Sequence, residues 1–158
     1  MSVYNSLDSV IQELRNNSPN FRITTQRKII IKAILSMKGH FSADEVLGEI
    51  FRLYPDLVGI SKATVYNTLD ILVKNRILTN IQAKTFKDEL NGGFYARNYY
   101  DRRLDAHINM VCTMCGKIED LDEIPLGNII KEITTNSSWD LIQETIGLHG
   151  ICQACKAG

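Results

Sequence analysis

Long apolar runs are missing from this chain. No stretch approaches the ~20 consecutive apolar residues that a membrane-spanning helix needs, and the first residues lack the basic-then-apolar pattern of a secretion signal. Internal repeats and low-complexity segments are missing as well. We therefore expect a soluble, cytoplasmic protein with no membrane partner. Its 158 residues, 44% of them hydrophobic, suffice for one domain or two small ones.

An overall excess of charge is also missing, because 18 Lys and Arg residues balance 18 Asp and Glu residues. The balance differs between the two halves of the chain. Residues 1–83 carry ten basic and seven acidic side chains, whereas residues 84–158 carry eight and eleven. A basic half favours contact with a polyanion, so the first half is the one expected to meet such a partner. A chance imbalance of charge between the two halves, with no functional meaning, is the alternative explanation of these counts.

Cysteine is scarce, and its few copies are paired. The four cysteines form two C-x-x-C motifs, Cys112 with Cys115 and Cys152 with Cys155. Two thiolates three residues apart on a tight turn can reach one ion, and two such turns complete a tetrahedral zinc site with bonds of ~2.3 Å. We interpret the four thiols as ligands of a structural Zn²⁺, because cytosolic cysteine pairs bind metals more often than they form disulfides. The alternative is a redox pair of the thioredoxin type, which normally has one such motif in a βαβ setting.

A second group of possible metal ligands is rich in oxygen and contains no thiol. It consists of Asp101, His107, Asn109 and Asp120. Nitrogen ligands are few, since the only histidines are His40, His107 and His149. Oxygen and imidazole donors suit harder ions than thiolates do. The spacing alone also fits solvated carboxylates beside a structural histidine, so a second metal site stays open on this evidence.

The first half of the chain has the periodicity of helices. Apolar residues at three- and four-residue steps predict helices over residues 7–14, from a cap at Thr24 or Thr25 to Met37, from residue 43 to a stop near Tyr54-Pro55, and over residues 62–73. Ser42 and Glu45 are spaced as a capping box, Ser61 is a second cap, and Gly39 is placed as a helix stop. Two apolar runs, 77–81 and 94–100, flank a polar segment with an Asn91-Gly92-Gly93 turn signal. Helices followed by such a hairpin predict a winged helix, in which one helix enters the DNA major groove.

The second half changes to the periodicity of strands. Residues 107–112 alternate as a strand that places His107 and Asn109 on one face, and residues 118–121 form a return strand. Residues 125–133 predict a helix with an inward stripe of Leu126, Ile129, Ile130 and Ile133. Residues 139–148 alternate again before the second C-x-x-C motif. The whole is an α+β fold with a domain boundary near residues 84–101.

Several segments resemble the ferric uptake regulator (Fur) family of dimeric, metal-dependent bacterial repressors. Residues 22–27 (Arg-Ile-Thr-Thr-Gln-Arg) resemble the start of the family's second helix, and residues 61–69 (Ser-Lys-Ala-Thr-Val-Tyr-Asn-Thr-Leu) its recognition helix. Residues 107–120 and 150–155, which contain both C-x-x-C motifs, resemble its metal-binding segments. These matches span nearly all of the chain and are most similar to the peroxide-sensing branch, the PerR repressors.

The resemblance gives the expected domains a role. Residues 1–83 would form an N-terminal winged-helix DNA-binding domain whose wing extends to about residue 98, with residues 84–101 as wing and linker. Residues 102–158 would form a small metal-binding α/β dimerisation domain with the four-cysteine zinc site.

The resemblance also implies a regulatory Fe²⁺ or Mn²⁺. Its ligands would be His40, Asp101, His107, Asn109 and Asp120. Asn109 stands where the branch commonly has a second histidine, and Asp120, where iron-uptake members usually carry glutamate, favours peroxide sensing. Asp105 competes with Asp101 as the linker carboxylate. Glu144 stands where a further family site would need a histidine, so that site is not expected.

The implied function is that of a transcriptional repressor and not of an enzyme. A homodimer would bind double-stranded operator DNA and release it when the bound iron reacts with peroxide and oxidises His40 and His107. DNA contacts are expected from Arg27, Lys62, Thr64, Tyr66 and Asn67, the first two to phosphates and the others to bases. An iron- or manganese-availability regulator of the same family is the nearest alternative. A zinc-stapled thiol oxidoreductase is an alternative from another class.

Overall fold

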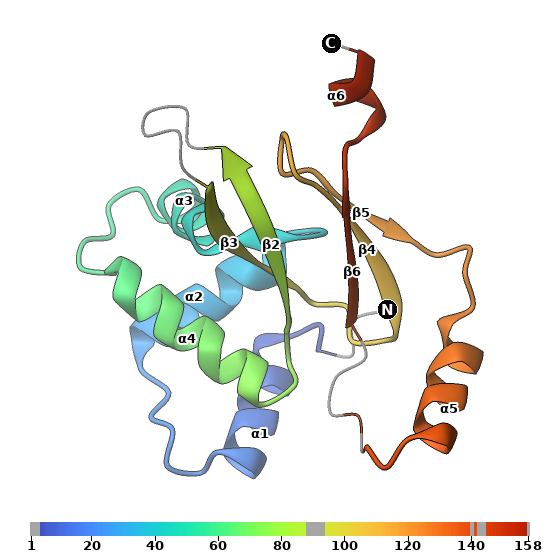
Figure 1. Ribbon diagram of the computed structural model, residues 1–158. Helices are drawn as coiled ribbons and strands as arrows, with labels where there is room; N and C mark the ends of the chain where they lie inside the picture. Colours follow the sequence, from blue (N-terminus) through green and yellow to red (C-terminus); the bar gives the residue numbers. More distant parts are fainter. Residues whose placement is uncertain (1–3, 88–93, 140, 142–144, 158) are drawn as a thin grey trace. The chain divides into compact units, whose positions relative to one another are not determined.

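The computed structural model describes residues 4–87, 94–139, 141 and 145–157 (Figure 1). The expected Asn91-Gly92-Gly93 turn and Glu144 lie outside the described residues. The chain divides into two compact units. One comprises Met1–Asn80 and Tyr99–Leu104, and the other comprises Ile81–Asn98 and Asp105–Gly158. Across the described part of the chain, no helix combines the length and the apolar content that crossing a membrane would demand.

The first unit is built from helices. These are α1 (Leu7–Asn17), α2 (Thr25–Ser36), α3 (Ala43–Leu53) and α4 (Lys62–Lys74). The sequence predictions of α3 and α4 are confirmed at their starts, since Ser42 and Glu45 form a reciprocal capping box and the Ser61 side chain accepts from the Thr64 N–H. Each cap satisfies amide donors that the first helical turn leaves without an intrahelical partner.

Helix α2 ends one residue earlier than the sequence predicts. It stops at Ser36, and Met37 is an extended C-cap whose N–H donates to the Ile34 carbonyl at 3.2 Å. Gly39, which the sequence suggested as the stop, takes a φ of +64° two residues beyond that cap. This left-handed conformation, which glycine adopts without a steric penalty, turns the chain into β1 (Phe41–Ser42).

A small sheet follows the helices. Its order is β1-β3-β2, with β2 at Thr79–Lys87 and β3 at Phe94–Asp101. Phe41 pairs with Tyr100 across β1 and β3, and their rings stack with centroids 6.3 Å apart. Both side chains belong to the core that the helices share, together with Leu14, Ile30 and Leu69. The four helices, with β1 paired to the end of β3 in the same unit, agree with the winged helix that the sequence predicts.

The second unit has a three-stranded sheet in the order β5-β4-β6 (Figure 1). Its elements are β4 (His107–Cys112), β5 (Ile118–Leu121), α5 (Leu126–Asn136), β6 (Thr145–Gly150) and α6 (Gln153–Ala157). Strand β4 is central, antiparallel to β5 and parallel to β6. The parallel pairing brings Gly150 opposite Cys112, although the two are far apart in the sequence.

Two expectations for this unit need correction. Leu126 and Ile130 are buried, but Ile129 and Ile133 are 44% and 47% exposed, so only half of the expected inward stripe faces the sheet. A three-stranded sheet covers one side of a helix, which leaves the edge of a wide apolar stripe outside. Strand β6 starts at Thr145, whereas the alternation suggested Trp139, which is 76% exposed. Helix α6 was not expected.

Candidate metal centres and DNA interface

Four cysteine sulfurs converge in the second unit. Cys112 ends β4, and Cys115 lies in the turn after it. Cys152 directly precedes α6, and Cys155 lies within that helix. All four Sγ atoms lie within 4.8 Å of one another, all four thiols are free, and Cys115 Sγ lies 3.7 Å from Cys152 Sγ. Bonds of ~2.3 Å to a tetrahedral Zn²⁺ place neighbouring sulfurs ~3.8 Å apart. The thiols therefore fit a structural zinc ion, as the sequence predicts.

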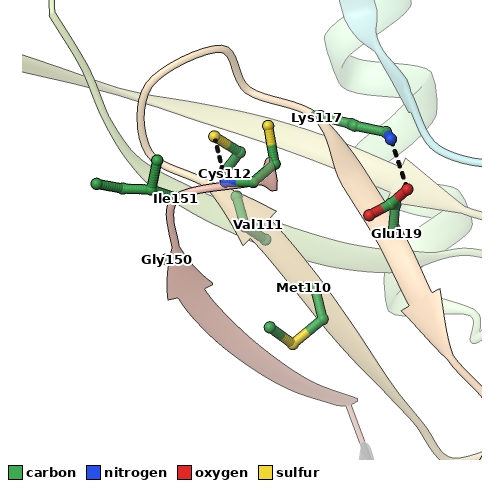
Figure 2. A pocket seen from close by; sticks show the side chains of 8 residues that line it. Met110, Val111, Cys112, Lys117, Glu119, Gly150 and Ile151 are labelled. Carbon is green, nitrogen blue, oxygen red and sulfur yellow. Dashed lines mark hydrogen bonds and ion pairs between the residues drawn. The ribbon is translucent and has the colours of Figure 1, made fainter. Parts of the chain in front are cut away.

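Backbone hydrogen bonds shape the two halves of this cluster. The Cys112 N–H donates to the Lys117 carbonyl at 2.8 Å, and Gly116, with a φ of +77°, donates to the Cys112 carbonyl at 3.0 Å. The Thr113 N–H and hydroxyl donate to the Gly150 carbonyl at 2.8 and 3.2 Å. Figure 2 shows Gly150 and Ile151 beside Cys112, at a hollow of about 150 Å³ that the Lys117–Glu119 ion pair borders. Thr113 thus ties one C-x-x-C motif to the other.

A different set of backbone hydrogen bonds prepares one thiol for metal binding. Burial alone would raise the pKa of Cys112, but N–H groups of Cys152, Cys115 and Met114 lower that pKa to about 6. The Cys152 N–H donates to Cys112 Sγ at 3.3 Å. Hydrogen bonds with the neighbouring thiols, that of Cys152 foremost, raise the pKa of Cys155 to about 12. One thiolate is thus stable by itself, whereas full ionisation of the cluster requires a cation.

The oxygen-rich donor set is divided between the two units. In the first unit, His40 Nε2 lies 3.6 Å from Asp101 Oδ2, and Asp101 is only 5% exposed. The Arg103 N–H donates to Asp101 Oδ1 at 3.0 Å and orients this carboxylate. Burial of a carboxylate beside an imidazole is costly without a cation or donors around it. This pair offers the imidazole and carboxylate donors that a hard divalent ion binds.

The second unit holds the other half of the set. His107 Nε2 lies 3.9 Å from Asp120 Oδ1, and Asn109 is fully buried opposite Asp120 in the β4–β5 register. His107 Nδ1 lies 2.7 Å from the Asp105 carbonyl, which can only accept. The proton therefore sits on Nδ1 and leaves Nε2 as the available ligand atom. Asp105 itself is exposed and contributes to this half through its backbone.

The expected DNA contacts lie at the starts of α4 and α2. Tyr66 and Asn67 are exposed on α4, whereas Thr64 is half-buried and its hydroxyl lies 2.9 Å from the Ser61 hydroxyl within the cap. Lys62 Nζ pairs with Asp44 Oδ1 at 2.5 Å and lies 5.9 Å from the Tyr66 ring centroid. Sequence reasoning missed this partner, because no local pattern connects the two helix starts.

Arg27 occupies the start of α2. Its guanidinium lies 4.3 Å from the Phe21 ring centroid and donates to the Arg22 carbonyl at 2.6 Å. The side chain is thus oriented by its own neighbours, and a guanidinium has five N–H donors, of which this bond uses one.

Known proteins share both the sequence pattern and the fold. The model of the Ferric uptake regulator family matches residues 18–149, most of the chain. The Peroxide-responsive repressor PerR of Staphylococcus aureus is 28% identical over 155 residues, 98% of this chain and 95% of that protein.

Two solved structures agree with this assignment. The Helicobacter pylori ferric uptake regulator Fur has a TM-score of 0.66 at 21% identity, with 96% of this chain and 94% of that chain covered. The Pseudomonas aeruginosa ferric uptake regulator, solved with manganese, has a TM-score of 0.63 at 21% identity, with 90% and 97% covered. Together with the matched sequence range, this common fold shows that the chain belongs to the ferric uptake regulator family.

Proposed function

We propose that this chain is a repressor that binds operator DNA as a homodimer and releases it when its bound Fe²⁺ reacts with peroxide. The observation that carries the proposal is the presence of two chemically distinct donor sets. One set is all thiolate, and the other consists of imidazole and oxygen donors, His40 with Asp101 in the first unit and His107 with Asn109 and Asp120 in the second. A thiolate cage holds zinc for structure, whereas an oxygen-rich set suits Fe²⁺ or Mn²⁺. The likeness to the S. aureus peroxide-responsive repressor supports the choice of signal.

The regulatory ion would take ligands from both donor pairs. Asp101 and Asp120 balance a divalent charge, and His107 presents Nε2 because its Nδ1 proton is held by the Asp105 carbonyl. Asp101 is favoured over Asp105 as the linker ligand, because its buried carboxylate lies beside His40. If bound, Fe²⁺ would supply the one-electron reduction of peroxide, and the ligands His40 and His107 would be the oxidisable side chains of the site. Oxidised His40 or His107 would bind the ion poorly, and the geometry required for DNA binding would be lost.

The α4 surface would read the operator. Tyr66 offers its ring to a thymine methyl and Asn67 its amide to a base edge, while Lys62 and Arg27 would contact phosphates and fix the register. Thr64 would reach a base only if its hydroxyl left the helix cap. Lys62 would have to leave the Asp44 carboxylate in order to contact a phosphate. Loss of that ion pair would offset part of the electrostatic gain from DNA binding.

Homodimerisation is supported by exposed apolar side chains in the second unit. Ile124, Ile129, Ile133, Leu148 and Ile151 are between 41% and 47% exposed. Exposed aliphatic side chains of this size are candidates for burial against another subunit. The family's regulators act as DNA-binding dimers, which agrees with this interpretation.

The nearest second candidate is a sensor of iron or manganese availability. Asn109 favours it, since an amide oxygen in place of an imidazole gives a weaker site and removes one oxidisable ligand. Under this alternative, DNA binding would follow the free metal concentration and peroxide would have little effect.

A comparison of two metal forms tests the proposal. Zinc-replete protein is loaded with Fe²⁺ or with Mn²⁺, treated with peroxide, and followed by fluorescence anisotropy on a DNA fragment selected by the protein. We expect loss of binding in the iron form alone, no recovery with a thiol reductant, and the mass of one added oxygen on peptides containing His40 or His107. Equal loss in both metal forms, or oxygen found only on cysteine, would refute it.

A further inference from the structure

Arg102 follows the buried Asp101 directly and turns its half-buried side chain back to the end of α2. Its Nη1 donates to the Leu35 carbonyl at 2.9 Å and to the Met37 carbonyl at 3.3 Å. Its Nη2 lies 3.3 Å from Asn5 Oδ1, in the residues before α1. One guanidinium therefore connects the segment after β3 to the last carbonyls of α2 and to the start of the chain.

These bonds lie on one side of His40, and a strand pairing lies on the other. Met37, whose carbonyl accepts from Arg102, precedes His40 by three residues. Phe41, the residue after His40, pairs with Tyr100, the residue before Asp101. The short segment that carries His40 is therefore fastened at both ends to residues that flank Asp101. The 3.6 Å approach of His40 to Asp101 lies between these two attachments.

The attachment made by Arg102 depends on the shape of the guanidinium as well as its charge. Carbonyls at a helix C-terminus lack intrahelical donors and carry partial negative charge, which a cation stabilises. A planar fork can donate to two carbonyls and an amide oxygen together, whereas a lysine ammonium is a point charge on a flexible stem. A neutral amide at this position would lose both the charge and the reach.

We propose that Arg102 is a positioning residue for the regulatory metal, a role that rests on the function proposed above. It holds the His40 segment against Asp101 before the ion binds. Binding then does not have to order that segment, and the ordering cost no longer subtracts from the affinity. The residue touches neither donor atom and acts through His40.

The test measures Mn²⁺ affinity by calorimetry in zinc-replete protein, because Mn²⁺ does not carry out the peroxide chemistry readily. Arg102→Gln should raise the Kd about tenfold or more, the scale of one or two lost hydrogen bonds to a charged group. Arg102→Lys should recover only part of the loss. Arg15→Gln is the control for charge, since it removes one positive charge from an exposed side chain of the same unit that has no role at the site. It should bind Mn²⁺ nearly as tightly as the wild type.

Other outcomes would overturn the assignment. A purely structural helix cap would lower the melting temperature of Arg102→Gln and leave the Mn²⁺ Kd unchanged. Equal losses of Mn²⁺ affinity in Arg102→Gln and Arg15→Gln would indicate a general effect of charge. Full recovery in Arg102→Lys would show that charge suffices and that the fork has no role. His40→Ala and His107→Ala test the regulatory site separately from the role of Arg102. If these two variants bind Mn²⁺ as tightly as the wild type, the proposed regulatory site is wrong, independently of the result for Arg102.

Discussion

Loss of the zinc ion should unfold the second unit before the first. The change is Cys112→Ser, which removes the most buried of the four thiols, 4% exposed, and the one whose pKa is already lowered to about 6. The hydrophobic cluster described between the sheet and α5 contains Ile108, Leu126 and Ile130 as its buried members. Burial of three such side chains contributes roughly 5–9 kcal/mol before the entropy of ordering the chain is subtracted.

A structural zinc site contributes more than that, on the order of 10–16 kcal/mol in apparent binding energy near neutral pH. The zinc-free second unit is therefore not expected to remain folded at 37 °C. The first unit has a far larger cluster, which includes Leu14, Ile30 and Leu69, and should keep its helices.

Calorimetry, circular dichroism and zinc content would be measured on Cys112→Ser and on wild-type protein treated with a strong chelator. In both samples we expect the transition of the second unit to fall below 37 °C or to be absent while the first unit melts separately at a higher temperature, with no bound zinc and with monomers in ultracentrifugation. Thr113→Val, which loses only the 3.2 Å hydroxyl bond to Gly150, is the matched control and should retain zinc. A Cys112→Ser protein that melted in one transition at the wild-type temperature and stayed dimeric would refute the reasoning. It would also revive the interpretation of these thiols as redox groups.

Three further predictions concern the surfaces. Tyr66→Ala should reduce the discrimination between operator and random DNA, whereas Arg27→Ala should weaken both and flatten the salt dependence; identical patterns in anisotropy titrations would contradict these roles. Asp44→Asn removes the carboxylate that pairs with a lysine on α4, so DNA binding should tighten about twofold to tenfold at low salt. This gain in affinity should vanish at high salt. An unchanged affinity at low salt would mean that the ion pair does not compete with phosphate. Ile133→Asp should give folded, zinc-containing monomers because the side chain is 47% exposed, while Phe51→Asp on α3, 51% exposed, should leave the dimer intact; an Ile133→Asp dimer of normal affinity would argue against α5 as part of the interface.

Features that depend on neighbouring residues could be predicted from the sequence. The Ser42–Glu45 box and the Ser61 cap are local, since a side chain bonds a backbone amide three residues away. The two C-x-x-C motifs are equally local, and the thiolate chemistry of zinc then requires that they meet. The β4 strand and its return β5 also followed from simple alternation.

Features that depend on which other helix or strand an element packs against could not be predicted. The periodic pattern assigns Ile129 and Ile133 to the inward stripe of the helix, but it does not show that the sheet is too narrow to cover them. The salt bridge between Lys62 and Asp44 joins two helix starts, and the Arg102 bonds to α2 span more than sixty residues of sequence. Contacts of this kind are set by the tertiary fold, so a single sequence carries no periodic signal for them.

The parallel pairing of β4 with β6 has a kinetic consequence. Because the first C-x-x-C motif ends β4 and the second follows β6, the four sulfurs meet only after the crossover through α5 has brought the two strands side by side. Such a long-range pairing requires closure of a large loop, whose entropy cost arises before any stabilising contact has formed. The pairing is therefore slow to form. During refolding, the rate of zinc uptake should therefore be independent of zinc concentration once the metal is in excess. Zinc uptake would then report the rate at which the sheet of the second unit forms.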